Sequence, residues 1–150
     1  MASELIETTV DKFVFRVKLG CWYSPSGVWV QPEDGVARVG VSDFVQQRSG
    51  DVAFVDVRPV GTVLAARDEF GSVETMKADL SLESPVSGTI TAVNQQLASS
   101  PELVNQDPYG GGWLALVELS DWKADRGALL DAEQYLETIR AEAVEEMGRE

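Results

Sequence analysis

The sequence has no histidine, one cysteine and few basic residues. Its 150 residues include 12 Lys and Arg against 25 Asp and Glu, so the formal net charge is −13. The absence of histidine excludes an imidazole base, a Ser-His-Asp or Cys-His nucleophile and a His-ligated metal. One cysteine forms neither an intrachain disulfide nor a Cys-rich zinc site. The acidic balance argues against nucleic acid and anionic membranes as partners, because both attract cations.

Long hydrophobic runs are also missing. No apolar stretch approaches the roughly 20 residues that span a bilayer, and the mixed-charge N-terminus lacks the apolar segment of a signal peptide. A single cysteine fits a reducing compartment. We therefore expect a cytoplasmic protein. No linker divides the chain, so residues 1–150 are predicted to form a single domain.

Short apolar segments separated by turns run through most of the chain. Strands are predicted at 10–18, 36–41, 52–57 and 113–119, and residues 20–35 have the glycines and prolines of a hairpin region. Such spacing predicts a mainly β fold, namely a flattened barrel or sandwich of short antiparallel strands.

Two helices are predicted. Ser42 precedes a short helical segment that it is able to cap. The last 20 residues form a longer helix, which begins with a capping box of Asp131 and Gln134. Its apolar side chains share one face: Leu136, Ile139, Ala143 and Met147. We expect this face to pack against the barrel rather than to bind a partner.

Two similar short segments, which we call the echo, lie on either side of the middle of the chain. PVGTV at 59–63 returns as PVSGTI at 85–90, each with a proline and glycine turn before a β-branched pair. The echo predicts two similar β half-units, packed with pseudo-symmetry. The segment between them would project as a hairpin at one end.

Lys77 lies near the centre of that segment. It is the only lysine between residues 19 and 122, and it stands among acidic residues. One interpretation is an exposed lysine that balances nearby carboxylates. Another is an attachment site, because an accessible amine at a turn can be acylated into a long arm. A Schiff-base lysine is disfavoured, since neighbouring carboxylates stabilise the charged amine.

Two further interpretations belong to other functional classes. Asp51 and Asp56 form a candidate carboxylate pair for a hydrolase, since paired acids can divide acid and base roles. They lie on or beside a predicted strand without a pocket pattern, so solvated side chains explain them better. An unmodified interaction domain is the other alternative, and it predicts that substitution of Lys77 is tolerated.

Several blocks of sequence resemble the H-protein family of the glycine cleavage system, which are lipoyl carriers related to the lipoyl domains of 2-oxo acid dehydrogenases. The matching blocks are VGVSDFVQ (39–46), GDVAFVDVRPVG (50–61), FGSVETMKA (70–78), ESPVSGTITAVN (83–94), PELVNQDPYGGGWL (101–114) and LLDAEQY (129–135). The resemblance covers about residues 28–140, and the blocks keep the order and spacing that they have in the family. The resemblance implies a lipoyl/biotinyl-type hybrid motif with a C-terminal helix.

The resemblance also implies a chemical role. The family carries lipoate as an amide on a lysine that matches Lys77 in ETMKA, and Glu74 would help the lipoate-attaching enzyme to recognise the hairpin. Such a protein is a carrier subunit without catalytic or metal-binding residues of its own, and we expect a monomer. In glycine cleavage it would carry the aminomethyl group between glycine decarboxylase and aminomethyltransferase, and dihydrolipoamide dehydrogenase would reoxidise the arm.

One stretch departs from the family. Glycine-cleavage H proteins typically read DHEW in the early hairpin, whereas this chain has Ser26, Gly27 and Val28 before Trp29. Gly27 and Val28 offer no side-chain acceptor for a loaded amine. A similar group of lipoate-binding proteins works with heterodisulfide-reductase-like complexes in bacterial sulfur oxidation and has a cysteine before this hairpin. Cys21 fits that group as well as a structural role, so the expected pathway is sulfur oxidation, with glycine cleavage as the alternative.

Overall fold

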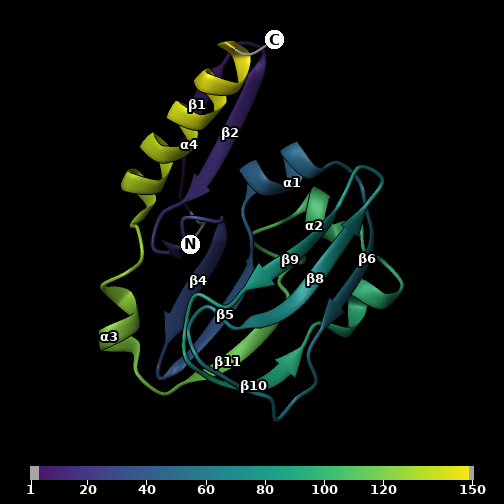
Figure 1. The fold of residues 1–150 in the computed structure, drawn as a ribbon, viewed down its shortest axis with the longest axis vertical. Helices are drawn as coiled ribbons and strands as arrows, with labels where there is room; N and C mark the ends of the chain where they lie inside the picture. Colours follow the sequence, from purple (N-terminus) through teal and green to yellow (C-terminus); the bar gives the residue numbers. More distant parts are fainter. Residues whose placement is uncertain (1–3, 149–150) are drawn as a thin grey trace.

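The computed structural model describes residues 4–148 and consists of three antiparallel sheets and a long C-terminal helix (Figure 1). Residues 1–3 and 149–150, the two ends of the predicted single domain, lie outside the described residues. The two-stranded sheet pairs β1 (Leu5–Val10) with β2 (Phe13–Lys18). The six-stranded sheet has the order β3 (Trp22–Tyr23), β4 (Val28–Glu33), β5 (Val36–Val41), β11 (Ala115–Leu119), β10 (Gly88–Val93) and β7 (Val63–Leu64). The three-stranded sheet has the order β6 (Val52–Val57), β8 (Glu69–Thr75) and β9 (Asp79–Glu83).

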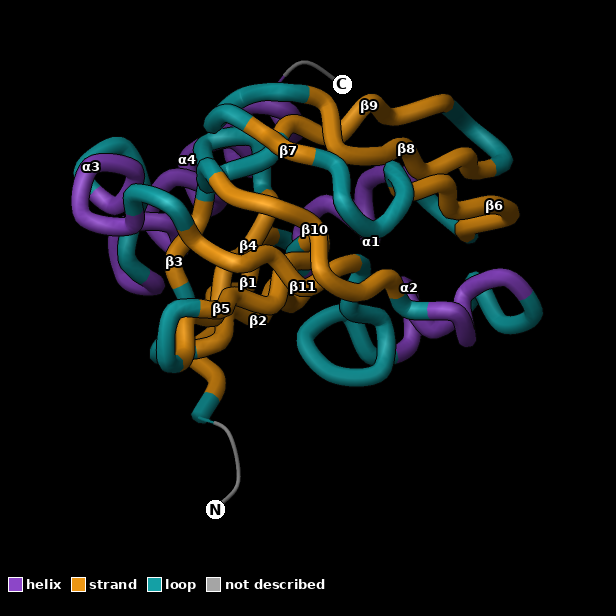
Figure 2. The backbone as a smooth tube through the Cα atoms, turned by 90° about the horizontal axis from the view of Figure 1, so that it is seen from below, coloured by secondary structure: helices purple, strands orange, loops and turns teal. Residues whose placement is uncertain are grey.

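The six-stranded and three-stranded sheets pack face to face, as Figure 2 shows from below. Alternate residues of both sheets point inward and form the main core, in which Phe70, Ile90 and Leu114 are fully buried. The mainly β sandwich predicted from the turn spacing is confirmed. The barrel alternative is wrong, because within residues 4–148 the sheets have open edges at β3, β7, β6 and β9.

The two echoed segments pair with each other. Gly88 and Thr89 of β10 lie opposite Leu64 and Val63 of β7, and the main-chain N–H of Gly61 donates to the carbonyl of Ile90 at 2.8 Å. The intervening chain forms the β8–β9 hairpin, which projects as the echo predicts (Figure 1).

Helix α4 (Ala132–Gly148) packs mainly against β1 and β2, not against the sandwich as expected. Tyr135, Ile139 and Ala143 are buried there in a second core with strand residues such as Phe15. Met147 of the predicted stripe is 46% exposed. Strand β1 is not predicted from the sequence, because LIETTV alternates only weakly in hydrophobicity; along the strand, exposed residues alternate with half-buried ones and only Val10 is buried.

Two predicted helix caps are confirmed. Ser42 Oγ accepts from the N–H of Val45 at 3.2 Å and begins α1 (Asp43–Ser49). Asp131 and Gln134 form a reciprocal capping box at α4, with hydrogen bonds of 2.8 and 3.0 Å. Three shorter elements complete the fold: the 3₁₀ helix η1 (Gln95–Ala98), α2 (Leu103–Gln106) and α3 (Trp122–Arg126).

Within residues 4–148, no helix has both the length and the hydrophobicity that crossing a bilayer requires.

Candidate functional site

Lys77 lies at the tip of the β8–β9 hairpin, where the sequence analysis expected it. The turn comprises Met76, Lys77 and Ala78, and all three are exposed. Thr75 holds this turn: its hydroxyl oxygen accepts from the N–H groups of Lys77 at 3.2 Å and Ala78 at 3.0 Å, and its own N–H donates to the carbonyl of Ala78 at 2.8 Å. A small polar residue thus satisfies the turn's backbone and leaves the lysine amine facing solvent.

The aliphatic part of Lys77 lies beside the turn that follows α1. A side chain at Gly50 would begin 3.5–3.7 Å from Lys77 Cγ, Cδ and Cε, and Gly50 has φ +85°. Asn105 anchors this turn, because its amide donates to the carbonyl of Gly50 at 3.0 Å and its Oδ1 accepts from the N–H of Val52 at 2.9 Å. The base of the lysine side chain therefore rests on a fixed surface.

Two hollows meet at Lys77. We call the first the terminal groove; it has a volume of about 440 Å³. It is lined by Val10, Asp11, Phe13, Phe15, Gln47, Arg48, Lys77, Ala143, Glu146 and Met147. We call the second the hairpin pocket; it has a volume of about 390 Å³. It is lined by Ser26, Val45, Arg48, Ser49, Lys77, Ala78, Leu80, Ser81 and Leu82.

Arg48 lines both hollows, and its guanidinium is held from two sides. Nη1 lies 3.4 Å from a carboxylate oxygen of Glu142, and Nη2 lies 2.5 Å from one of Glu146. The guanidinium carbon also lies 4.9 Å from the ring centre of Phe44, within cation–π range. Arg48 and Lys77 therefore stand at the boundary between the two hollows.

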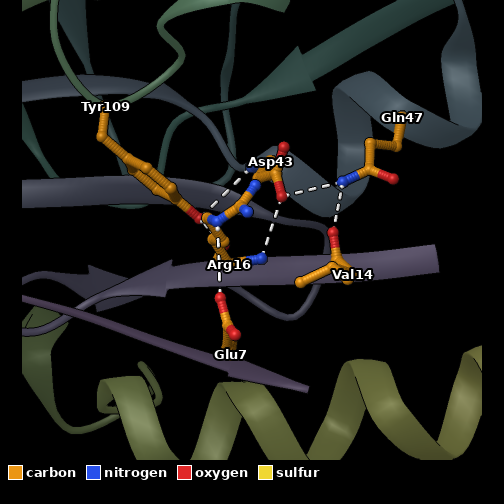
Figure 3. Close-up of polar contacts among 6 residues, drawn as sticks. All are labelled: Glu7, Val14, Arg16, Asp43, Gln47 and Tyr109. Atoms are coloured by element: carbon orange, nitrogen blue, oxygen red, sulfur yellow. Dashed lines mark hydrogen bonds and ion pairs between the residues drawn. The ribbon is translucent and has the colours of Figure 1, made fainter. Parts of the chain in front are cut away.

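Asp43, at the start of α1, ties the β1–β2 hairpin to the site (Figure 3). Its carboxylate accepts from the main-chain N–H of Arg16 at 2.9 Å and from the side-chain amides of Gln46 and Gln47 at 2.8 and 2.9 Å. The Tyr109 hydroxyl accepts from the N–H of Asp43 at 3.2 Å and donates to the carbonyl of Arg16 at 2.7 Å. Burial raises the pKa of Tyr109 well above its usual value, which keeps that donor protonated.

The remaining sequence candidates lie apart from the hollows. Glu74 is exposed near the end of β8, opposite Asp79 in the hairpin register. Asp51 and Asp56 are both exposed, and neither lines the terminal groove or the hairpin pocket. Cys21 is 3% exposed, and burial raises the pKa of its thiol to about 11, so the thiol form prevails at neutral pH.

The departure at Gly27 has a steric cause. Gly27 has φ +94°, and a Cβ there would lie 2.3 Å from Val45 Cγ2 and 2.9 Å from the Tyr135 hydroxyl. That hydroxyl is hydrogen-bonded to Ser42 Oγ at 2.7 Å. Val28, the next residue, is buried in the main core. The side chains of α4 and α1 fill the space that a larger residue at Gly27 would need.

Neither Arg48 nor the terminal groove was predictable from the sequence. Arg48 lies in an ordinary polar segment, QQRSG. Its partners on α4 are far away in the sequence, and Glu142 follows it by 94 residues. No local pattern announces a contact of that range. The excess of glutamates in the C-terminal helix was the one feature of the sequence that could have indicated a basic partner for it.

Both the sequence and the fold are similar to those of known proteins. Residues 21–142 match the family model described as glycine cleavage H-protein. The chain is 48% identical over 120 residues to the glycine cleavage system H protein of Alcanivorax borkumensis, covering 80% of this chain and 93% of that protein. It is 49% identical over 121 residues to the one from Mycobacterium avium, covering 78% and 92%. The crystal structure of a glycine cleavage system H protein from Mycobacterium marinum superimposes with a TM-score of 0.74 at 31% identity, covering 80% of this chain and 96% of that chain.

Proposed function

Because the chain belongs to the glycine cleavage H-protein family, we propose that it carries lipoate as an amide on Lys77 and serves the glycine cleavage system. One observation carries the assignment of Lys77. It is the only lysine between residues 19 and 122, and it stands exposed at the tip of a hairpin whose ETMKA sequence matches the lipoylated motif of the family. As a family member the protein is a carrier subunit and not itself a catalyst.

The residues around Lys77 fit an attached lipoyl group. The amine is accessible to a modifying enzyme, and Thr75 keeps the turn in shape without using the lysine side chain. When bound, the group supplies a dithiol/disulfide couple on a long tether. This chain's own residues present the tether's anchor and offer two hollows beside it. Tethering raises the effective concentration of the arm at each partner's active site.

Glu74 is proposed as a recognition residue for the lipoate-attaching enzyme. Its side chain is exposed and lies three residues before Lys77, so an enzyme that closes over the hairpin tip would meet both. Substitution Glu74→Gln should slow lipoylation by on the order of tenfold, because the loss of a rim charge lowers the rate of association with the enzyme. Asp56→Asn, which removes an exposed carboxylate on β6 away from the hairpin tip, is the matched control and should leave the rate within about twofold. Equal rates for wild type and Glu74→Gln would remove Glu74 from this role.

The proposed partners are those of glycine cleavage: glycine decarboxylase, aminomethyltransferase and dihydrolipoamide dehydrogenase. The family model and the relatives compared above all bear the glycine cleavage name, so the support favours this pathway over sulfur oxidation. The sulfur-oxidation interpretation depended on Cys21 and on the missing His and Glu. Both features have a structural account here, namely burial of the thiol and the space filled by Tyr135 beside Gly27. The net charge of −13 would steer the carrier toward basic mouths on its partners.

The experiment is intact mass measurement after incubation with lipoate, ATP and a lipoate-attaching enzyme. We expect one lipoyl addition, located on Lys77 by peptide mapping, and none in Lys77→Arg. Lys123→Arg, a lysine outside the hairpin, should be modified like wild type. No addition would refute the assignment and favour the unmodified interaction domain. An addition that persists in Lys77→Arg would also refute the assignment, because it would place the lipoyl group on another residue. Glycine-dependent CO₂ release with partner enzymes then tests the pathway.

A further inference from the structure

The two edges of the β1–β2 hairpin differ in their hydrogen bonding. On β2, main-chain groups of Val14, Arg16 and Lys18 point away from β1 and are bonded by side chains of other elements; Figure 3 shows the bonds at Val14 and Arg16. The bonds measure 2.7–2.9 Å, and the side chains are those of Tyr23, Asp43, Gln47 and Tyr109. The outer edge of β2 is therefore closed to a further strand.

Strand β1 has an open outer edge. The N–H of Leu19 donates to the carbonyl of Glu4 at 3.0 Å, so these two residues form a hydrogen-bonded pair of the ladder. Hydrogen-bonded pairs alternate along antiparallel strands, which directs the N–H and C=O groups of Leu5, Glu7 and Thr9 away from β2. All three residues are exposed, and within residues 4–148 these outward groups have no hydrogen-bond partner. Such an edge is a template for another strand.

An apolar stripe of α4 lies on the side of this open edge. Arg48 of α1 binds Glu142 and Glu146, which fixes the flank of α4 that faces α1 and β2. The opposite flank carries four residues at helical spacing, which we call the outer stripe: Leu136, Arg140, Val144 and Met147. Val144 is 51% exposed, and Leu5 on β1 is 48% exposed. Large apolar side chains that gather beside an unpaired strand indicate a surface that another protein covers.

Helix α4 runs along β1, so each position on the helix has a level on the strand. At the start of the helix, Ala132 lines a small hollow with Leu19, and at its end Met147 lines the terminal groove with Val10. The rise is about 1.5 Å per residue in a helix and 3.3 Å in a strand, which puts Glu7, near the middle of β1, level with the middle of α4. That level is also the middle of the outer stripe.

One two-fold axis satisfies both elements. An antiparallel pair of β1 strands centred on Glu7 bonds all three outward residues, with Leu5 of each chain opposite Thr9 of the other. The same axis passes the middle of the outer stripe, where Leu136 of each chain meets Val144 of the other. Neighbouring strands lie about 4.8 Å apart, so two helices that each cover a two-stranded hairpin would lie about 10 Å apart, the usual spacing of packed helices.

The charges near that axis are compatible with the pairing. Glu7 would face its own copy, but Arg16 Nε lies 3.5 Å from its carboxylate. Arg140 would also face its own copy, and its guanidinium lies 3.1 Å from the carboxylate of Glu137. In an antiparallel pair of helices, Arg140 comes within one turn of the other chain's Glu137, so each guanidinium lies between carboxylates of both chains. Opposite charges thus offset the like charges, despite the net charge of −13.

We propose that the open edge of β1 and the outer stripe form a homodimer interface, in which two copies of this chain build a four-stranded antiparallel sheet covered by two helices. The length of α4 and the stacking of one helix on one sheet give a contact about 25 Å long and 15 Å high. Counted over both chains this buries roughly 1,000 Å², the lower limit of specific interfaces, so we expect a Kd on the order of 10–100 µM.

The dimer is compatible with the proposed function and does not depend on it. Lys77 lies beside the turn after α1, on the side of the hairpin away from the open edge, and stays exposed in the dimer. The proposal replaces the monomer expected from the sequence with a dimer that forms as the concentration rises.

Sedimentation velocity of the full chain, from about 5 µM to about 500 µM, measures the association. We expect the weight-average sedimentation coefficient to rise over this range. Thr9→Pro removes an outward N–H that the β1–β2 ladder does not use, and edge strands accept proline, so it should weaken the dimer at least about tenfold. Thr9→Val keeps that N–H and is the matched control. Circular dichroism and Tm check that both variants are folded.

Charge substitutions test the outer stripe and the axis. Val144→Glu places a carboxylate between the two helices and should weaken the dimer at least about tenfold. Ala141→Glu makes the same change of charge at an exposed position outside the stripe, and should leave the Kd within about twofold. Glu7→Gln removes the like-charged pair at the axis and should strengthen the dimer about threefold.

Hydrogen exchange identifies the edge, because protection of the amides of Leu5, Glu7 and Thr9 should rise with protein concentration. A monomer at every concentration would overturn the proposal and leave the edge to a strand of another protein. A dimer that is not weakened in Thr9→Pro and Val144→Glu, or protection that does not rise, would also overturn it, because the contact would lie elsewhere. Failure of Lys77 to acquire lipoate would refute the proposed function and leave the dimer untouched.

Discussion

Removal of the Asp43 carboxylate should loosen the β1–β2 hairpin. Asp43→Ala leaves the main-chain N–H of Arg16 without its acceptor, which costs roughly 1–2 kcal/mol. It also removes a negative charge from the first turn of α1, worth about 0.5 kcal/mol. Gln46 and Gln47 are able to turn their amides to water, so their bonds add little. We expect the free energy of unfolding to fall by about 2 kcal/mol and Tm by about 6 °C.

Guanidinium unfolding followed by tryptophan fluorescence measures the total loss, and hydrogen exchange locates it. Protection should fall most for the amides of β1 and β2, because Asp43 and Tyr109 make two of the polar links between this hairpin and the rest of the fold (Figure 3). Asp51→Ala, which removes an exposed carboxylate just after α1, should cost less than about 0.5 kcal/mol. A loss in Asp43→Ala as small as this control, or a loss without weaker protection in the hairpin, would refute the reasoning.

Three further predictions concern stability. Burial raises the pKa of the folded-state Cys21 thiol from 9.0 to about 11, so the stability that depends on the protonated thiol is intact below pH 9 and is lost as the pH rises to 11. Over that range wild type should lose up to about 3 kcal/mol more than Cys21→Ala, and parallel pH curves in alkaline denaturation would contradict this. Gly27→Ala should cost about 3 kcal/mol or more, because a Cβ meets Val45, whereas Gly35→Ala, with similar φ of +82° and open space, should cost only about 1 kcal/mol in urea unfolding. Asp131→Ala should cost about 1 kcal/mol and lower helical circular dichroism; no change would show that the box does not hold α4.

Local rules predicted much of the sandwich. Strands β5 and β6 occupy the predicted residues 36–41 and 52–57, because each is a β-branched run bounded by turn residues. Ser42 and Asp131 begin their helices because a side-chain oxygen satisfies an N–H that the helix leaves free. The Lys77 turn was also predictable, since the echo placed a hairpin between two similar halves.

The element against which α4 packs could not be predicted from local rules. Its apolar face predicted burial, but the sequence does not say against which element a helix packs. The answer depended on β1, whose polar threonines and glutamate weaken its strand signal. The terminal groove is formed by that packing and therefore could not be predicted from the sequence either. Lys77 and Glu74 needed the family resemblance to gain a chemical meaning, because exposed charged side chains on a hairpin have many uses.

The packing of β1 on α4 has a kinetic consequence. It joins the two ends of the chain, so its contacts close almost the longest loop that the sequence allows. Long loops cost the most entropy and form late, which predicts that this unit is absent from the folding transition state. Substitutions in the second core, such as Ile139→Ala, should then accelerate unfolding and leave the refolding rate nearly unchanged. The carrier would assemble its sandwich and the Lys77 hairpin first, and enclose the groove beside them last.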